Sequence, residues 1–455
     1  MKSHLSPLSV VQRALGLSAA GTVGVIIAVV PYHAFLTTWA GYVFGSPLVW
    51  KSWKEIVLGL AIIGLLAASA MPRTRYRAAF MRVLRQPLTC VIFAYAALHL
   101  VLAAVYRNPT GSTLAGLMTN LRFLAILLTA QWLVAVFPVG SARLQRFATK
   151  ATLVSGVVLA VLGIAQVFVL SPDFLAQFGY NKNTTIAPFI TVDQNMGALR
   201  AFATMRGPNT LGMFFLLPLA MLGVLITRKR HIRLAVPAMA LCIFALYLTG
   251  SRSAWLGALV TLVALLLGLS GKKRTIQLAR RFGAPLVIAL IGLAVLAESV
   301  PSIRLALFHS SPGDSSLTEG STDKHGEATL NGAKDALAHP LGRGPGEAGP
   351  ASFYSPDGAR IAENYYVQVA QEVGLFGLIL FMAILYLVGR RLWRVASAKN
   401  ASMLALGLFA SFWGIAVINL LLHGWADDPN ALVWWGLAGL AILADNTVHD
   451  HKTAA

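Results

Sequence analysis

The chain of 455 residues is 57% apolar, only 12% charged, and carries a formal net charge of +20. A soluble domain is about half apolar and about a quarter charged, so this composition excludes an ordinary soluble protein. The Lys and Arg residues stand in short patches at the ends of apolar runs, which argues against nucleic-acid binding and for a protein embedded in a lipid bilayer.

The apolar runs predict a single all-α membrane domain over residues 1–455 with about twelve transmembrane helices. Each run approaches the ~20 residues that cross ~30 Å of hydrocarbon. The predicted spans are 13–33, 53–71, 87–106, 114–138, 150–171, 207–227, 234–250, 253–270, 282–301, 364–388, 401–423 and 431–446.

The basic residues predict the orientation of these spans. About two thirds of the 37 Lys and Arg residues fall in connections that all face the cytoplasm if the N-terminus is cytoplasmic. Short loops rich in Lys and Arg are retained on that side. We therefore expect twelve spans with both chain ends in the cytoplasm.

Two connections on the opposite, extracytoplasmic side are long. The first is 171–206, and the second, 302–363, follows the ninth span. The second is expected to contain a helix over 323–338 and a stretch rich in Gly and Pro from 339 to 350. Ordered loops of this length are usually functional, so we look for the site there.

Two arginines stand where an extracytoplasmic loop enters a span. Arg206 precedes Gly207-Pro208-Asn209, and Arg252 lies in Gly250-Ser251-Arg252-Ser253. Helix N-termini have free N–H groups, and a guanidinium fork suits phosphate, so the pair predicts a phosphate or diphosphate site. The alternative is that each arginine reaches toward lipid headgroups. For the pair beside the long loops, we favour the phosphate site.

Arg122 is predicted to lie within the fourth span, where a charge is costly. It could complete the anion site or neutralise a carboxylate such as Glu372, and the sequence does not decide between the two. The doublet Asp427-Asp428 could hold a metal but has no further obvious ligands, so we expect a loop cap and no metal site.

Glu363 stands at the extracytoplasmic mouth of the tenth span and could act as a general base toward a sugar hydroxyl. The alternative is a carboxylate that is merely favoured at a helix N-terminus. Glu372 lies nine residues further on, about 13 Å along a helix, so the two carboxylates cannot act as one pair. His339, before Pro340, is expected to be a turn residue rather than a ligand.

The order of these motifs resembles the O-antigen ligase and Wzy-type polysaccharide polymerase superfamily. The resemblance rests on the order of four motifs and runs from about the fourth to the eleventh span. The motifs are Arg206-Gly207-Pro208-Asn209, Gly250-Ser251-Arg252-Ser253-Ala254, His339-Pro340-Leu341-Gly342-x-Gly344, and Asn364-x-Tyr366 through Glu372-x-Gly374-Leu375-x-Gly377.

The resemblance implies a metal-independent, inverting glycosyltransferase without cofactors in a bacterial cytoplasmic membrane. Its donor would be a glycan on undecaprenyl diphosphate, and its acceptor a glycan or lipid-glycan hydroxyl outside the cytoplasm. Arg206 and Arg252 would hold the diphosphate. The candidate substrate-binding residues are Arg122, Asn364 and Tyr366, together with His339, for which a turn is the favoured alternative.

This sequence departs from the family at one position. Many of the ligases have a histidine directly before the residue that matches Asn364, where this chain has Glu363. A carboxylate can also serve as a base, and such a variant suits a polymerase or a ligase with another acceptor; as the overall reading, we favour the polymerase slightly. The alternative from another class is a transporter of polyprenyl-linked saccharides, which would have two related halves that are not visible here.

Overall fold

The computed structural model describes residues 7–71, 75–192, 195–270, 277, 321–356 and 358–443. The predicted ninth span, 282–301, and the start of the predicted long loop, 302–320, lie outside these residues. The described helices are α1 (Pro7–Val29), η1 (Val30–Tyr32), α2 (His33–Phe44), α3 (Pro47–Lys51), α4 (Trp53–Ala70), α5 (Arg75–Leu84), α6 (Pro87–Tyr106), α7 (Thr110–Val136), α8 (Pro138–Phe168), η2 (Pro172–Phe178), α9 (Pro208–Thr227), α10 (Ile232–Leu248), α11 (Arg252–Leu269), α14 (Ser321–Ala338), η3 (Gly349–Tyr354), α15 (Tyr365–Ala396), α16 (Met403–Ile418), η4 (Gly424–Ala426) and α17 (Asp428–Ile442).

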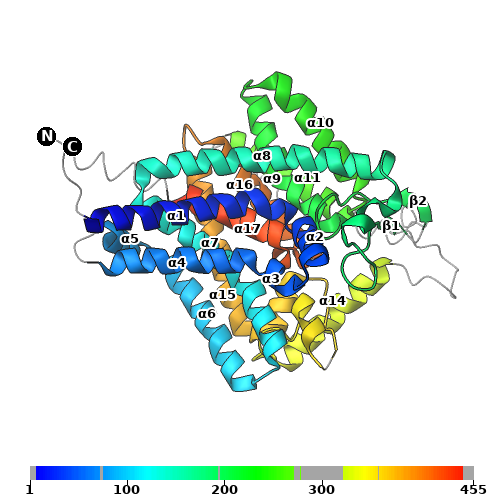
Figure 1. Cartoon of the computed structure of the whole chain (residues 1–455), viewed down its shortest axis with the longest axis horizontal. Helices are drawn as coiled ribbons and strands as arrows, with labels where there is room; N and C mark the ends of the chain where they lie inside the picture. Colours follow the sequence, from blue (N-terminus) through cyan, green and yellow to red (C-terminus); the bar gives the residue numbers. More distant parts are fainter. Residues whose placement is uncertain are drawn as a thin grey trace.

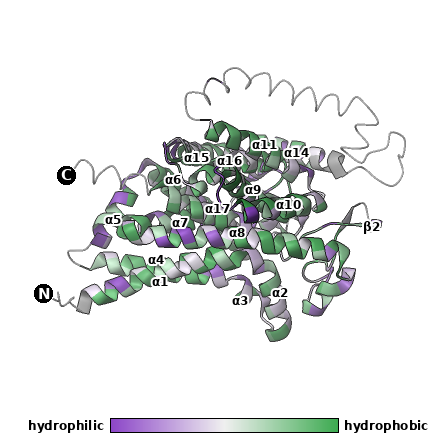
Figure 2. Cartoon of the chain, turned by 90° about the horizontal axis from the view of Figure 1, so that it is seen from above, coloured by the Kyte–Doolittle hydropathy of each residue, from purple (hydrophilic) through white to green (hydrophobic). Residues whose placement is uncertain are grey.

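The prediction of an all-α polytopic membrane protein is confirmed. Among the described residues, eight helices are long and apolar enough to cross a membrane, and α10 and α16 are shorter apolar helices. Each of these helices, and α17 as well, overlaps one of the predicted spans. Most residues of these helices are hydrophobic, as the colouring in Figure 2 shows. The number twelve stays a prediction.

The helices pack in a bundle in which α1, α4 and α8 run side by side (Figure 1). Helix α17 lies inside the bundle, in contact with α7, α9 and α16, and its residues from Pro429 to Ile442 are all buried. Small residues allow this close approach, as is usual in membranes. A Cβ on Gly439, for example, would lie 2.5 Å from the carbonyl oxygen of Leu127 in α7.

The described residues of the connection 171–206 contain η2 and two short antiparallel strands, β1 (Thr191–Val192) and β2 (Asn195–Leu199). Leu175, Tyr180 and Phe202 are buried together, and Phe35 of α2 packs against them. This cluster fixes the loop against the helix ends. The residues that lead into α9 are therefore held in place.

Helix α15 is interrupted at Val373 and Gly374, whose backbone angles are not helical. The segment after α14 fills this interruption. The amides of Arg343 and Gly344 donate to the carbonyl oxygens of Gln371 (2.8 Å) and Glu372 (2.9 Å), and Leu375 donates to Pro340 (2.9 Å). A break in a membrane helix must be satisfied by other groups, and here the Gly-rich loop satisfies it.

Candidate functional site

The N-termini of α9 and α11 are packed against each other. Pro208 is the first residue of α9 and Arg252 the first of α11. A Cβ on Gly212 would lie 2.6 Å from the Cβ of Ala254 and 3.4 Å from that of Ser251, so only a glycine permits this approach. The fold thus brings together the two helix ends that carry the predicted arginines.

Arg200, which the sequence analysis did not single out, links these two ends. Its Nε donates to the carbonyl oxygen of Thr249 (2.7 Å), just before α11, and its Nη2 to Oδ1 of Asn209 in the first turn of α9 (3.2 Å). The side chain lies over Gly250, 3.2 Å from where a Cβ would be. Its only signal in the sequence was one basic residue in a long outer loop, which was too weak to find it.

The two predicted arginines differ in their surroundings. Arg206 is exposed and forms no hydrogen bond or ion pair with any residue that the structure describes. Arg252 is half-buried at the start of α11 and does interact with its surroundings. Arg206 therefore has a guanidinium available to an anionic ligand, beside the free backbone N–H groups of the first turn of α9.

The connection between α16 and α17 (residues 419–427) joins the start of α15 to this arginine region. At the α15 end, the amide of Tyr365 donates to the carbonyl oxygens of Asn419 (2.9 Å) and Leu422 (3.2 Å). The side chain of Asn364 donates to the carbonyl oxygen of Leu420 (3.0 Å). The start of α15 is thereby fixed to the end of α16.

The same connection reaches α9 at its other end. Thr210, in the first turn of α9, donates from its hydroxyl to Oδ2 of Asp427 (2.7 Å). Asn430 of α17 donates from Nδ2 to the carbonyl oxygen of Thr210 (3.1 Å). The sequence motifs at Arg206 and Asn364 are therefore connected through residues 419–427, of which the sequence analysis had considered only Asp427.

Glu363 precedes α15 with φ = +51°, in the left-handed region that non-glycine residues rarely adopt. The helix cap is its neighbour Asn364, whose side chain accepts from the amides of Tyr366 (2.9 Å) and Val367 (3.1 Å). Capping therefore does not explain why a carboxylate stands at 363. Unusual backbone of this kind is often found at functional sites.

His423 lies opposite Glu363, with 3.9 Å between Nδ1 and the carboxylate Oε2. Sequence reasoning missed this histidine because the two residues are far apart in the chain and His423 lies in no recognised motif.

The other predicted binding residues all form hydrogen bonds within the protein. Asn364 caps α15, Tyr366 donates from its hydroxyl to the carbonyl oxygen of Ala416 (3.0 Å), and His339 contacts Asp335 of α14 through Nδ1. His339 also begins a turn, because the amide of Gly342 donates to its carbonyl oxygen (2.8 Å). A role of these residues in substrate binding stays a prediction.

Arg122 pairs with carboxylates other than the one suggested. Its guanidinium contacts Glu55 (3.3 Å) and Asp428, and it donates to the carbonyl oxygen of Ala426 (2.7 Å). Glu372 instead accepts from Nδ2 of Asn120. The suggested pairing of Arg122 with Glu372 is therefore wrong, because α4 and α17 supply nearer carboxylates.

Asp428 is the centre of a buried charge network, so the expectation of a simple loop cap is wrong for it. Besides Arg122, it contacts Lys54 (3.2 Å) and Nε2 of His33 (3.2 Å). Trp53 donates to Nδ1 of His33 (3.1 Å), so the ring carries its proton on Nε2 and donates to Asp428. Two cations thus balance Glu55 and Asp428, as buried charges require.

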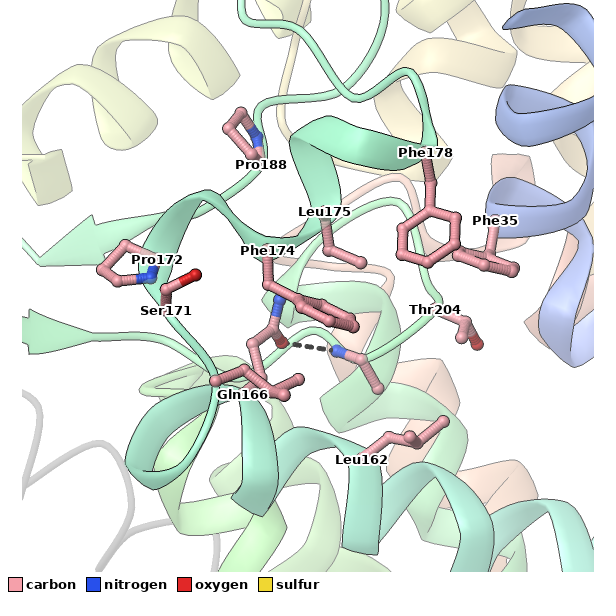
Figure 3. Close-up of a pocket in the computed structure, with 12 residues that line it drawn as sticks. Phe35, Leu162, Gln166, Ser171, Pro172, Phe174, Leu175, Phe178, Pro188 and Thr204 are labelled. Atoms are coloured by element: carbon pink, nitrogen blue, oxygen red, sulfur yellow. Dashed lines mark hydrogen bonds between the residues drawn. The ribbon is translucent and has the colours of Figure 1, made fainter. Parts of the chain in front are cut away.

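An apolar cavity of about 240 Å³ lies beside the residues that lead to Arg206 (Figure 3). Its residues are Phe35, Leu162, Gln166, Leu170, Ser171, Pro172, Phe174, Leu175, Phe178, Pro188, Ala203 and Thr204. Gln166 accepts a hydrogen bond from the amide of Ala203 (2.9 Å), which fixes α8 to the segment that leads to Arg206. None of the lining residues is charged, so the cavity suits an apolar group rather than a phosphate.

Asp335 of α14 binds both the Gly-rich loop that follows α14 and helix α15. Arg343 donates to both of its carboxylate oxygens (2.6 and 3.2 Å), and Gln371 of α15 donates to Oδ2 (2.9 Å). The hydrogen bonds from Arg343 hold the pKa of Asp335 below its ordinary value of 3.8. Among the described residues, no group of three or more His, Cys, Asp or Glu side chains could hold a metal ion.

Comparison with known proteins adds one finding. Residues 237–382 match the family model described as O-antigen ligase. The matched region contains Arg252, His339, Glu363, Asn364 and Tyr366, whereas Arg206 and Arg122 lie before it. No curated protein matches the chain.

The match confirms the resemblance drawn from the motifs, and it supports a ligase-type or polymerase-type role in polysaccharide assembly. Over residues 237–382, the chain is similar to the O-antigen ligase family.

Proposed function

We propose that this protein transfers or polymerises a saccharide from undecaprenyl diphosphate onto a sugar hydroxyl at the extracytoplasmic face of a bacterial cytoplasmic membrane. The observation that carries the proposal is the meeting of the α9 and α11 N-termini, with the unpaired guanidinium of Arg206 beside them. Backbone N–H groups, helix dipoles and a guanidinium together favour a diphosphate.

The reaction is a displacement at the anomeric carbon of the donor sugar. The acceptor oxygen forms the new glycosidic bond while the bond from the anomeric carbon to the diphosphate oxygen breaks. Arg206 and Arg252 would stabilise the negative charge that the diphosphate gains as it leaves. Attack from the opposite side inverts the configuration at the anomeric carbon.

Glu363 is the candidate base that accepts the proton of the acceptor hydroxyl. It belongs to the same connected assembly as the two arginines, since residues 419–427 bind both the start of α15 and Thr210 of α9. The apolar cavity beside Ala203 and Thr204 offers room for an apolar part of the lipid carrier near Arg206. This arrangement supports an enzyme whose donor is anionic and lipid-linked.

The test uses purified protein and a polyprenyl-diphosphate oligosaccharide, with and without EDTA. Longer lipid-linked chains would identify a polymerase, and transfer to a separate glycan acceptor would identify a ligase. We expect turnover to persist in EDTA. Absence of any turnover, together with movement of the lipid-linked saccharide across proteoliposome membranes, would contradict the proposal and favour the transporter.

Arg206→Lys and Arg252→Lys test the diphosphate site within the same assay. Lysine keeps the charge but loses the two-pronged guanidinium, so we expect weaker donor binding and about ten-fold or greater loss of turnover at low donor concentration. Arg230→Lys, in the connection between α9 and α10, is the matched control. Wild-type kinetics in both variants would contradict the diphosphate site and favour the alternative that Arg206 and Arg252 contact lipid headgroups.

A further inference from the structure

His423 and Glu363 form a pair of polar side chains at a junction that is otherwise built from backbone contacts. Nδ1 of His423 lies 3.9 Å from Oε2 of Glu363, and the two side chains are 26% and 24% exposed. Both are therefore accessible to a ligand from solvent. The partial exposure distinguishes them from the neighbouring polar groups of the helix junction, such as Asn419, which is fully buried.

The backbone around this pair is fixed on both sides. Asn364 and Tyr365 bind the carbonyl oxygens at the end of α16. Asn419 holds the turn that follows, because its Oδ1 accepts from the amide of Trp425 (3.1 Å). Glu363 and His423 are therefore presented to each other by segments that cannot separate without breaking these hydrogen bonds.

The buried charge network around Asp428 holds the other end of the same turn. Arg122 donates to the carbonyl oxygen of Ala426, the last residue of η4, and pairs with Asp428 two residues later. The indole of Trp425 is buried against Phe123 and Trp434. The position of His423 is thus determined by α7 and α17, although neither helix contains it.

We propose that His423 is a positioning residue for Glu363 in the transfer reaction, which rests on the function proposed above. A proton on Nδ1 would be donated to Oε2 and would orient the carboxylate as Oε1 accepts the proton of the acceptor hydroxyl. A separation of 3.9 Å is long for a hydrogen bond, but such bonds are often long without substrate and shorten in the reacting complex.

In the transfer step, the hydroxyl proton moves to Oε1 of Glu363 as the acceptor oxygen bonds to the anomeric carbon. The diphosphate leaves with the bonding electron pair. His423 keeps its proton throughout, and Glu363 then loses the new proton to solvent, which reaches both side chains. Atoms and charges balance without a further reactant.

The experiment is a double-mutant cycle on the purified enzyme with the lipid-linked donor and its acceptor. His423→Ala should lower kcat by about ten-fold to a hundred-fold with an unchanged KM for the donor. His423→Asn should recover part of the rate, because its amide N–H occupies a position close to that of Nδ1. His231→Asn, before α10 and remote in sequence from the site, is the control and should keep the wild-type rate.

The coupling between His423 and Glu363 in the double-mutant cycle decides whether the inference holds. If His423 acts through Glu363, His423→Ala should change the residual rate of Glu363→Gln by less than about two-fold. Wild-type kcat in both His423→Ala and His423→Asn would overturn the inference while the proposed function stands. Fully additive losses of rate in the His423→Ala, Glu363→Gln double variant would overturn it as well. A wild-type enzyme that transfers no saccharide would overturn the proposed function itself.

Discussion

Glu363 and Asn364 are neighbours in the chain with different surroundings. Asn364 caps α15 with its side chain and is buried, whereas Glu363 is partly exposed with a left-handed backbone. The side-chain cap of α15 is Asn364, so the alternative role of Glu363 at the helix N-terminus would come from the helix dipole alone. A carboxylate held in this way has the access that a base needs.

Glu363→Gln should preserve the shape of the site and donor binding yet lose most turnover. A positioned base contributes about 10²–10⁴ to the rate, and glutamine cannot accept the proton. The measurement is kcat for saccharide transfer, with Glu327→Gln on the exposed face of α14 as the control. Glu363→Gln at the wild-type rate would leave Glu363 without a catalytic role and make His339 the next candidate.

At the scale of elements, the Gly-rich motifs have a structural explanation. The loop after α14 enters the break in α15 and packs against the start of α7, where a Cβ on Gly346 would collide with the carbonyl oxygen of Ser112. Glu347 is buried there, bound by Ser112 (3.2 Å) and Arg360 (3.2 Å). The glycines of this loop therefore allow it to pack closely on α7 and α15.

Gly346→Ala should destabilise the protein more than Gly358→Ala. Both glycines have φ = +87°, so both substitutions carry the conformational cost of about 1–2 kcal/mol. Only at 346 does the added Cβ also meet backbone, because nothing lies within 4 Å of it at 358. The apparent unfolding temperature in detergent measures the difference. Equal losses in the two variants would mean that the loop can move away from α7.

The contact of Asp335 with Arg343 predicts a pH dependence of the same loop. The folded pKa of Asp335 is below 3.8, so its contribution to stability is present above pH 3.8 and is lost as the pH falls through the folded pKa. Asp335→Asn should lower the apparent unfolding temperature at pH 7. The wild type should approach the variant as the pH falls below 3.8. A constant difference across this range would contradict the assignment.

At the scale of the whole molecule, orientation follows from the distribution of Lys and Arg. Single cysteines near Arg77 and Arg230 should resist a membrane-impermeant thiol reagent in intact cells, whereas one near Asn183 should react. Cys90 is exposed and must first be replaced, while Cys242 is buried. Labelling near Arg77 and Arg230 would reverse the topology and move the candidate site to the cytoplasmic face.

The spans could be predicted because their signal is local. A run of about twenty apolar residues buries its own backbone hydrogen bonds in a helix, whatever its neighbours are. The helix predicted over 323–338 is confirmed by α14, whose residues are mostly polar. The break in α15 at Gly374 gave no local signal, because it is stabilised by Pro340 and Arg343 from a distant segment.

The sequence by itself determined the all-α membrane class, the positions of the described apolar helices and, through the order of its motifs, the resemblance to the O-antigen ligase family. Only the tertiary structure decided which polar groups meet. Arg122 binds Ala426 and Asp428, and Glu363 faces His423, across long stretches of chain. The physical reason lies in the specificity of the two interactions. Any hydrophobic residue is stable in an apolar environment, whereas a buried charge is stable only beside a particular partner, which another helix must supply.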